Sequence, residues 1–296
     1  MTTYSETFEL KAPATRVWTA LLDEDLLVQW LADAVRVEAK PGGVYRFWGA
    51  GVIWGESEAE TAGEILELDT PRRLVFSWRW KGHASRVTIE ISQPNSESPA
   101  TSAPSSQETC RLAIEQTFET FAPGSDGPGP DMAACHWRIA FGNLASVLAT
   151  GRAALRPDYS IDTAPGQDVE LEIEIAAPPE RVFRALMDPA QVRIWMQAEA
   201  PEIDADRDRY SYGWTRGTPP EEVGPSRIVE YVPDRLLVFD WNWTDEAPGR
   251  VRWELLPIAS GTRLRLVHEN FTELANVLGW SEALVEIRNL IESEGR

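Results

Sequence analysis

Several stretches of the chain alternate between apolar and polar residues in a way that predicts β-strands. Val169–Ile175 alternates strictly between apolar residues and glutamates, which is typical of a strand with one buried face. Phe76, Trp78 and Trp80 likewise lie on one face of a predicted strand, with polar residues between them. Further strands are predicted around Phe239, Trp241 and Trp243, around Val87, Ile89 and Ile91, around Val251, Trp253 and Leu255, around Leu112, Ile114 and Gln116, and around Leu264, Leu266 and His268.

Other stretches have the spacing of amphipathic helices. Val17, Ala20 and Leu21 share one face of a short predicted helix, and a second short helix follows it and carries Trp30. Much longer helices are predicted from Met132 to about residue 150 and over Glu273–Ile291. The order is a strand, two short helices, a run of antiparallel strands and one long helix, which predicts an α+β fold.

This order of elements occurs twice, because the chain contains an internal repeat. Trp30 returns as Trp195 and Trp137 returns as Trp280, each with similar surroundings. The other repeated segments are Ala12–Leu21 with Ala177–Leu186, Arg72–Trp80 with Arg235–Trp243, and Cys110–Gln116 with Thr262–His268. We therefore expect two domains of one fold in tandem.

The loops between these segments set the expected domain boundaries. We expect a first domain over residues 1–152, a linker over 153–167 that contains two prolines, and a second domain over 168–296. Residues 94–107 are rich in Ser, Pro and Thr and are expected to form a flexible insertion in the first copy.

The repeated motifs resemble those of the helix-grip superfamily, whose members are also called START-like or Bet v 1-like. Within it, they are similar to the group named after the activator of the Hsp90 ATPase. The residues that carry the resemblance are Ala-Pro-x-x-Arg-Val followed by Trp18 or Phe183, the sequence Leu-Val-Phe-Ser/Asp-Trp that ends at Trp78 or Trp241, Thr262–Phe271, and Gly279 with Trp280.

The resemblance implies a curved antiparallel sheet wrapped around the long C-terminal helix of each copy, with two short helices after the first strand. It also implies a cavity between sheet and helix, where members of the superfamily hold lipids, sterols, polyketides, hormones or drugs. The copies differ, since Glu115-Gln116-Thr117 in the first stands where the second has Val267-His268-Glu269. They need not bind the same molecule.

Tryptophan is unusually frequent, with 13 residues against 9 Phe and 6 Tyr. The indoles on the inner strand faces and at the long helices either wall an apolar pocket or fill the core, and both interpretations fit the pattern. The candidate wall residues are Trp78, Trp80, Trp137, Trp241, Trp243, Trp253 and Trp280. Trp30 and Trp195 recur where the second short helix meets the sheet, so we expect a structural role for them.

Gln116 and His268 occupy matched positions on the inner face and complete the candidate ligand-binding set. Either side chain could orient a carbonyl or hydroxyl group of a ligand. His268 is also the one candidate for a catalytic acid or base, because histidine ordinarily titrates near neutral pH. The alternative is that His268 has no functional role and is hydrogen-bonded within the core.

Composition excludes several classes of partner. The net charge is −19, from 28 Lys and Arg against 47 Asp and Glu, so nucleic acids and anionic membranes are not expected as partners. No apolar stretch is long enough to span a bilayer and the N-terminus lacks a signal-peptide pattern, which leads us to expect a cytoplasmic protein. The three histidines, His83, His136 and His268, and the two cysteines, Cys110 and Cys135, show no metal-ligand spacing, and no motif indicates a cofactor.

Three hypotheses follow for function. The first is binding of an apolar small molecule, polyketide-like or polyene-like, in natural-product biosynthesis, transport or self-resistance. The second is a cyclase, isomerase or hydrolase that acts on such a molecule with His268 as acid or base. The third is a partner of an Hsp90-type chaperone. The two domains can also pack as a pseudo-dimer, as two subunits do about a twofold axis.

Overall fold

The structure is a computed structural model that describes residues 1–93, 108–119, 129–160, 167–243, 249–269 and 274–294. The chain divides into two compact units, unit 1 from Met1 to Ile161 and unit 2 from Asp162 to Arg296. The insertion expected at 94–107 lies outside the described residues.

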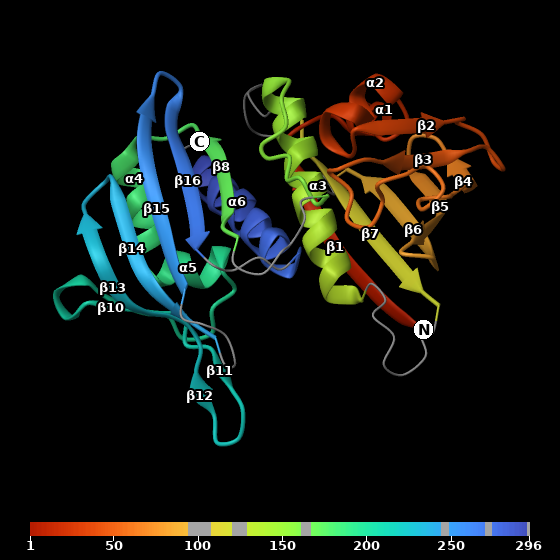
Figure 1. Ribbon diagram of the computed structural model, residues 1–296. Helices are drawn as coiled ribbons and strands as arrows, with labels where there is room; N and C mark the ends of the chain where they lie inside the picture. The colour runs from red at the N-terminus through yellow and green to blue at the C-terminus, as the bar shows by residue number, and fades with distance from the viewer. Residues whose placement is uncertain (94–107, 120–128, 161–166, 244–248, 270–273, 295–296) are drawn as a thin grey trace, which may run out of the picture. The chain divides into compact units, whose positions relative to one another are not determined.

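Unit 1 is one curved antiparallel sheet with a long helix across its inner face (Figure 1). The sheet order is β1-β7-β6-β5-β4, and β2 and β3 form a separate two-stranded sheet. The elements are β1 (Thr2–Leu10), α1 (Ala14–Ala20), α2 (Glu24–Trp30), β2 (Ala34–Val37), β3 (Tyr45–Trp48), β4 (Ile65–Asp69), β5 (Arg73–Trp80), β6 (His83–Ser92), β7 (Cys110–Phe118) and α3 (Pro130–Thr150).

Unit 2 repeats this arrangement with a larger sheet, in the order β8-β16-β15-β14-β13-β10-β9, and β11 pairs with β12 in a small separate hairpin. Its elements are β8 (Val169–Ile175), α4 (Pro179–Met187), α5 (Pro189–Trp195), β9 (Glu202–Asp204), η1 (Ala205–Arg207), β10 (Arg209–Ser211), β11 (Thr215–Arg216), β12 (Glu221–Glu222), β13 (Gly224–Val232), β14 (Leu236–Asn242), β15 (Gly249–Ile258), β16 (Gly261–Glu269) and α6 (Leu274–Glu294).

The predicted fold class is confirmed in both units. Each has a strand, two short helices, antiparallel strands and a closing long helix, in that order. The long helix of unit 1 begins at Pro130, somewhat earlier than predicted, because proline is well suited to the first helical turn. It ends where Gly151 adopts a left-handed conformation, with φ of 78°.

In each unit, a tryptophan and a tyrosine at equivalent positions donate hydrogen bonds to the end of the first short helix. Trp30 Nε1 donates to the carbonyl of Ala20 at 3.0 Å, and the Tyr45 hydroxyl donates to the carbonyl of Leu21 at 2.8 Å. In unit 2, Trp195 Nε1 donates to the carbonyl of Ala185 and the Tyr210 hydroxyl donates to that of Leu186, both at 2.8 Å. These bonds satisfy carbonyls at the end of the first short helix, and they account for the recurrence of Trp30 and Trp195.

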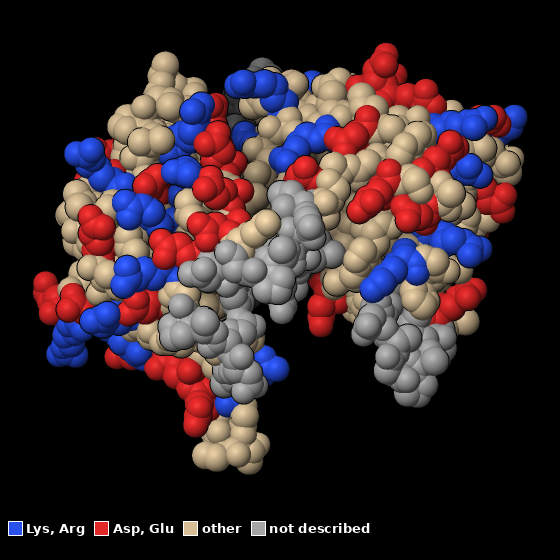
Figure 2. All heavy atoms as spheres, in the orientation of Figure 1, with Lys and Arg blue, Asp and Glu red and all other residues tan. Residues whose placement is uncertain are grey.

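The outer face of the unit 2 sheet is covered with alternating charges. Figure 2 shows Lys, Arg, Asp and Glu side chains interspersed over this part of the molecule. Arg265, for example, bridges Glu170 at 2.8 Å and Glu254 at 3.1 Å. Exposed pairs of this kind add little stability each, but they leave the inner face as the apolar face of the sheet.

Candidate functional site

In unit 1 the inward side chains of β5 meet the long helix in a cluster of aromatic rings. Trp78 and Trp80 stack with their ring centroids 4.6 Å apart, and Trp78 meets Trp137 of α3 edge-on at 5.8 Å. All three are at most 1% exposed. We call Phe47, Trp78, Trp80, His136 and Trp137 the unit 1 aromatic cluster.

A chain of buried hydrogen bonds fixes this cluster to the sheet. Trp137 Nε1 donates to Gln116 Oε1 at 2.8 Å, and Gln116 Nε2 donates to Ser85 Oγ at 3.0 Å. Ser85 Oγ in turn donates to the carbonyl of Trp78 at 2.9 Å. Gln116 therefore joins the helix to two strands, and its inward position agrees with the alternation along β7.

Unit 2 has the corresponding cluster, in which His268 takes the place of Gln116. Trp280 of α6 donates from Nε1 to His268 Nδ1 at 2.9 Å. The Trp280 ring lies 5.5 Å from the Trp241 ring and 5.6 Å from the Trp253 ring, measured between centroids. We call Tyr212, Trp241, Trp243, His268 and Trp280 the unit 2 aromatic cluster. Trp253 adjoins this cluster through its contact with Trp280.

The hydrogen bond from Trp280 sets the tautomer of His268. Because Nδ1 accepts this bond, the proton of the neutral ring is assigned to Nε2. The ring is fully buried, and burial lowers the pKa of His268 to about 3. His268 is therefore neutral near pH 7 and is a weak base at that pH.

Trp243 differs from the other candidate residues in its exposure. It follows the last residue of β14 and is half-buried, although its ring stacks on that of Trp241 at 6.4 Å. The half-buried Trp214 lies 6.5 Å from Trp243, and the guanidinium of Arg216 lies 5.6 Å from the centre of the Trp243 ring. Aromatic surface of the unit 2 cluster is thus partly open at this end.

The nine residues proposed from the sequence fall into two groups, one in each unit. Unit 1 brings together Trp78, Trp80, Gln116 and Trp137, and unit 2 brings together Trp241, Trp243, Trp253, His268 and Trp280.

Sequence reasoning missed two members of the unit 1 cluster, Phe47 and His136, and the histidine bears more on the chemistry of the site. The His136 ring is 4% exposed and lies against Trp78 at 5.3 Å and Trp80 at 5.4 Å. Burial lowers the pKa of His136 to about 4, so this histidine is also neutral near pH 7. Its position directly before Trp137 at the start of the long helix was the available signal.

Some buried polar atoms in these clusters have no hydrogen-bond partner among the described residues. They include the indole nitrogens of Trp78 and Trp253 and Nε2 of His136. Buried polar groups in native proteins are nearly always paired with protein, water or ligand.

Beside the unit 1 cluster, a cavity of about 20 Å³ lies between α2, α3 and the segment after α3. Its lining includes Trp30, His136, Asn143 and Tyr159. It has room for about one water molecule, whereas small-molecule pockets usually measure about 300–1,000 Å³.

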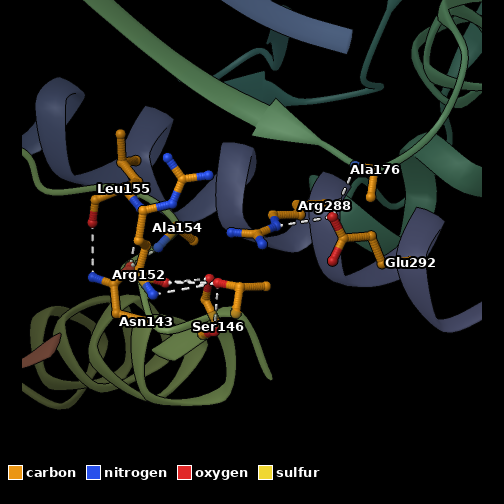
Figure 3. Close-up of polar contacts among 9 residues, drawn as sticks. Asn143, Ser146, Arg152, Ala154, Leu155, Ala176, Arg288 and Glu292 are labelled. Carbon is orange, nitrogen blue, oxygen red and sulfur yellow. Dashed lines mark hydrogen bonds and ion pairs between the residues drawn. The ribbon is translucent and has the colours of Figure 1, made fainter. Parts of the chain in front are cut away.

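The segment after α3 closes this side of unit 1. Asn143 accepts from the backbone nitrogens of Ala154 at 2.9 Å and Leu155 at 3.0 Å, and donates to the Leu155 carbonyl at 2.7 Å (Figure 3). Arg156 bonds to the carbonyl of Val28 and, at 2.8 Å, to Asp33. We call residues 152–160 the strap.

Two further properties concern possible cofactors and membranes. Within the described ranges, no group of three His, Cys, Asp or Glu side chains is placed to hold a metal ion. None of the helices in the described part of the chain combines the length and the apolar character needed to cross a membrane.

A sheet that curves around one long helix, with two short helices after the first strand, defines a helix-grip domain, and this protein has two. The family described as Activator of Hsp90 ATPase homolog 1-like protein matches residues 11–120 and again 176–292. The chain belongs to this family, and the resemblance noted in the sequence is confirmed.

Several solved structures are similar to this chain at low identity. DynU16, from the dynemicin biosynthetic locus, is 16% identical, with all of both chains covered and a TM-score of 0.39. The di-domain ARO/CYC BexL from the BE-7585A biosynthetic pathway is 17% identical, covering 99% of this chain and 93% of its own, with a TM-score of 0.32. An HSP90 activator from Plasmodium falciparum is 17% identical over 50% of this chain and 95% of its own, with a TM-score of 0.38. No curated protein matches the chain.

Proposed function

We propose that this protein binds an apolar small molecule with a planar conjugated skeleton, of polyketide or polyene type, against an aromatic wall inside a helix-grip domain. The role we propose is in natural-product biosynthesis, transport or self-resistance. The observation that carries the proposal is the convergence of indoles from the sheet and the long helix, as in Trp241, Trp253 and Trp280 of unit 2.

The chemistry of these side chains suits such a ligand. Flat indole faces stack favourably on conjugated rings, and ligand pockets are lined mainly by aromatic side chains with a few polar groups. The buried indole N–H of Trp253, which has no partner among the described residues, is a donor available to a carbonyl or phenol oxygen.

The enzymatic alternative has less support from the geometry. A general base near neutral pH needs a pKa close to the working pH, whereas burial lowers the pKa of His268 to about 3. Its Nδ1 is also occupied by the bond from Trp280. His268 is better suited to holding the helix and orienting a ligand than to moving a proton. The chaperone alternative requires a complementary surface, which the interior clusters do not supply.

Titration of the intrinsic tryptophan fluorescence tests the proposal. We expect saturable quenching by anthraquinone or by a conjugated polyene fatty acid, and Trp241→Phe should weaken binding by about tenfold through loss of stacking surface. Trp18→Phe is the matched control, because position 18 corresponds to Phe183 in the second copy and lies in α1, outside both clusters. The absence of saturable quenching by either compound would contradict the proposal.

A further inference from the structure

In unit 1, the ring of His136 fills the space between the sheet and the start of the long helix. Besides Trp78 and Trp80, it lies against Trp137 at 5.0 Å and is parallel to Phe47 at 6.5 Å, with 15° between the ring planes. The imidazole thus occupies the middle of the unit 1 aromatic cluster, where the described residues leave only the cavity of about 20 Å³ beside it.

The matching position in unit 2 is Gly279, which has no side chain. The register is fixed by equivalent hydrogen bonds, since Trp137 donates to Gln116 and Trp280 donates to His268. The residue before each tryptophan therefore corresponds, His136 in unit 1 and Gly279 in unit 2. No atom of a described residue lies within 4 Å of a β-carbon built on Gly279, apart from the backbone of its own helix and its chain neighbours.

The stacked pair of indoles on the inner strand is also spaced more widely in unit 2. Trp78 and Trp80 stack at 4.6 Å, whereas Trp241 and Trp243 stack at 6.4 Å. Trp80 is fully buried and its Nε1 donates to a backbone carbonyl at 2.7 Å, while Trp243 is half-buried. Both rings of the indole pair are therefore buried in unit 1, whereas in unit 2 the Trp243 ring of the corresponding pair is partly exposed.

A second pair of rings follows the same trend. The centroids of Phe47 and Trp78 are 4.9 Å apart, and those of their unit 2 counterparts, Tyr212 and Trp241, are 6.3 Å apart. The contact between the long helix and the sheet is nearly unchanged, at 5.8 Å in unit 1 and 5.5 Å in unit 2. The wider spacing is confined to the contacts of Trp241, because Tyr210 and Tyr212 lie closer at 5.8 Å than Tyr45 and Phe47 at 6.3 Å. Unit 2 thus has longer ring contacts along the sheet around Trp241, with an equally short contact between sheet and helix.

We infer that unit 2 is the ligand-binding copy and that a planar conjugated group of the ligand lies beside Gly279, where the imidazole of His136 lies in unit 1. The inference rests on the proposed function and assigns its site. Gly279 is then the residue that leaves this space open in unit 2, and His136 makes unit 1 a closed structural copy. The ligand class is a flat, apolar, conjugated molecule, because the rings of Trp241, Trp243 and Trp280 form the unit 2 cluster.

Exchange of the two residues in the full chain tests this inference. The probe is Nile red, a neutral planar dye with a ring carbonyl whose emission rises in apolar surroundings. We expect about one dye per chain, an affinity at least about tenfold lower in Gly279→His, and no loss of affinity in His136→Gly. Gly279→Ala is the matched control, since a methyl group in open space should leave binding intact.

The outcomes separate the inference from the proposed function. If the wild-type chain binds neither Nile red nor anthraquinone saturably, the proposed function fails, and the inference fails with it. If the dye binds but Gly279→His does not weaken it, or if His136→Gly weakens it as much, the assignment to unit 2 is wrong. Gly279→Leu repeats the test with an apolar side chain, and near-UV circular dichroism checks that each variant has native packing.

Discussion

At the scale of single residues, Gln116 and His268 have the same role, because each accepts a buried hydrogen bond from a tryptophan of the long helix. Each sits on the inner face of its sheet and accepts a hydrogen bond from the indole of the long helix, at 2.8 Å in unit 1 and 2.9 Å in unit 2. An indole N–H buried in this position needs an acceptor, because an unpaired buried donor costs about 1–3 kcal/mol. The two residues are therefore natural replacements for each other.

Gln116→Leu should destabilise unit 1 by about 2 kcal/mol, because it leaves the Trp137 donor without its acceptor and removes the donor to Ser85. Gln116→His, which introduces the residue of the second copy, should recover most of this loss. Urea unfolding monitored by tryptophan fluorescence measures both variants. Equal destabilisation by leucine and histidine would show that the hydrogen bond is not what position 116 supplies.

The buried histidines should make stability depend on pH. The pKa of His268 is about 3 in the folded chain and near the ordinary 6.5 when unfolded, so the unfolded state binds the extra proton between these values. The contribution is complete above about pH 6.5 and is lost progressively as the pH falls toward 3. At pH 5 the loss reaches about 2 kcal/mol, at about 1.4 kcal/mol for each pH unit.

His268→Gln removes this titration and keeps an acceptor for Trp280, as Gln116 does for Trp137. We expect the variant to match the wild type at pH 7.5 and to exceed its stability at pH 5 by about 2 kcal/mol, measured by urea unfolding at both pH values. Carboxylate protonation affects both proteins alike and cancels in the comparison. Parallel pH profiles would mean that His268 titrates normally in the folded chain.

Sequence reasoning found part of the site, and the reason lies in the periodicity it used. Strand alternation has a period of two, so it places Trp78 and Gln116 inward with little ambiguity. His136 escaped notice because adjacent helical residues differ by about 100° in direction, and a residue beside an inward tryptophan is not assigned to a face by spacing alone. The open space at Gly279 depends on how the rings pack, which no linear pattern expresses.

At the scale of elements, the long alternating strands and the closing helices were predictable, while short strands were not. β8 coincides with the predicted Val169–Ile175 because seven residues display a full alternation. β9, β11 and β12 have two or three residues each and are too short to show a period. β9 pairs with β10, and β11 pairs with β12, in short local hairpins, so turn geometry and not residue alternation determines where these strands form.

The strap is the clearest case of structure that local composition conceals. Pro157 and the small residues before it predict a linker, yet residues 152–160 are held against α3 by buried polar groups (Figure 3). Unit 2 has no counterpart to Asn143, because Glu286 stands at the matching helical position. The strap is therefore a feature of unit 1 that closes the side of the domain near His136.

Asn143→Ala should release the strap. The three bonds to Ala154 and Leu155 are lost, which leaves two backbone nitrogens and a carbonyl unpaired and should cost about 2–3 kcal/mol. Hydrogen exchange at the amides of Ala154 and Leu155 should accelerate. Asn289→Ala, at an exposed asparagine of α6, is the control and should change stability by less than about 0.5 kcal/mol. Unchanged exchange at both amides would show that other contacts hold the strap.

At the scale of the whole molecule, duplication has given each unit a complete sheet. Every strand of the two large sheets pairs with strands of its own unit, and each unit has its own closing helix. A gene that carries two copies of a domain can keep one for stability and change the other for binding. The exchange of His136 for Gly279 and the difference in ring spacing fit this division. The pseudo-dimer packing of the two domains stays a prediction.

Separation of the units tests this division directly. Because neither sheet borrows a strand, fragments 1–161 and 162–296 should each show native circular dichroism and unfold cooperatively when produced alone.

Fragment 162–296 should bind Nile red with nearly the affinity of the full chain, since Gly279 and the rings of the unit 2 aromatic cluster all lie within it. Fragment 1–161 should bind the dye at least about tenfold more weakly, because His136 fills the corresponding space. A folded fragment 1–161 that binds as tightly as fragment 162–296 would mean that the imidazole does not close unit 1. If fragment 162–296 does not fold when produced alone, unit 2 depends on unit 1 for its stability, and the expected independence of the two sheets is wrong.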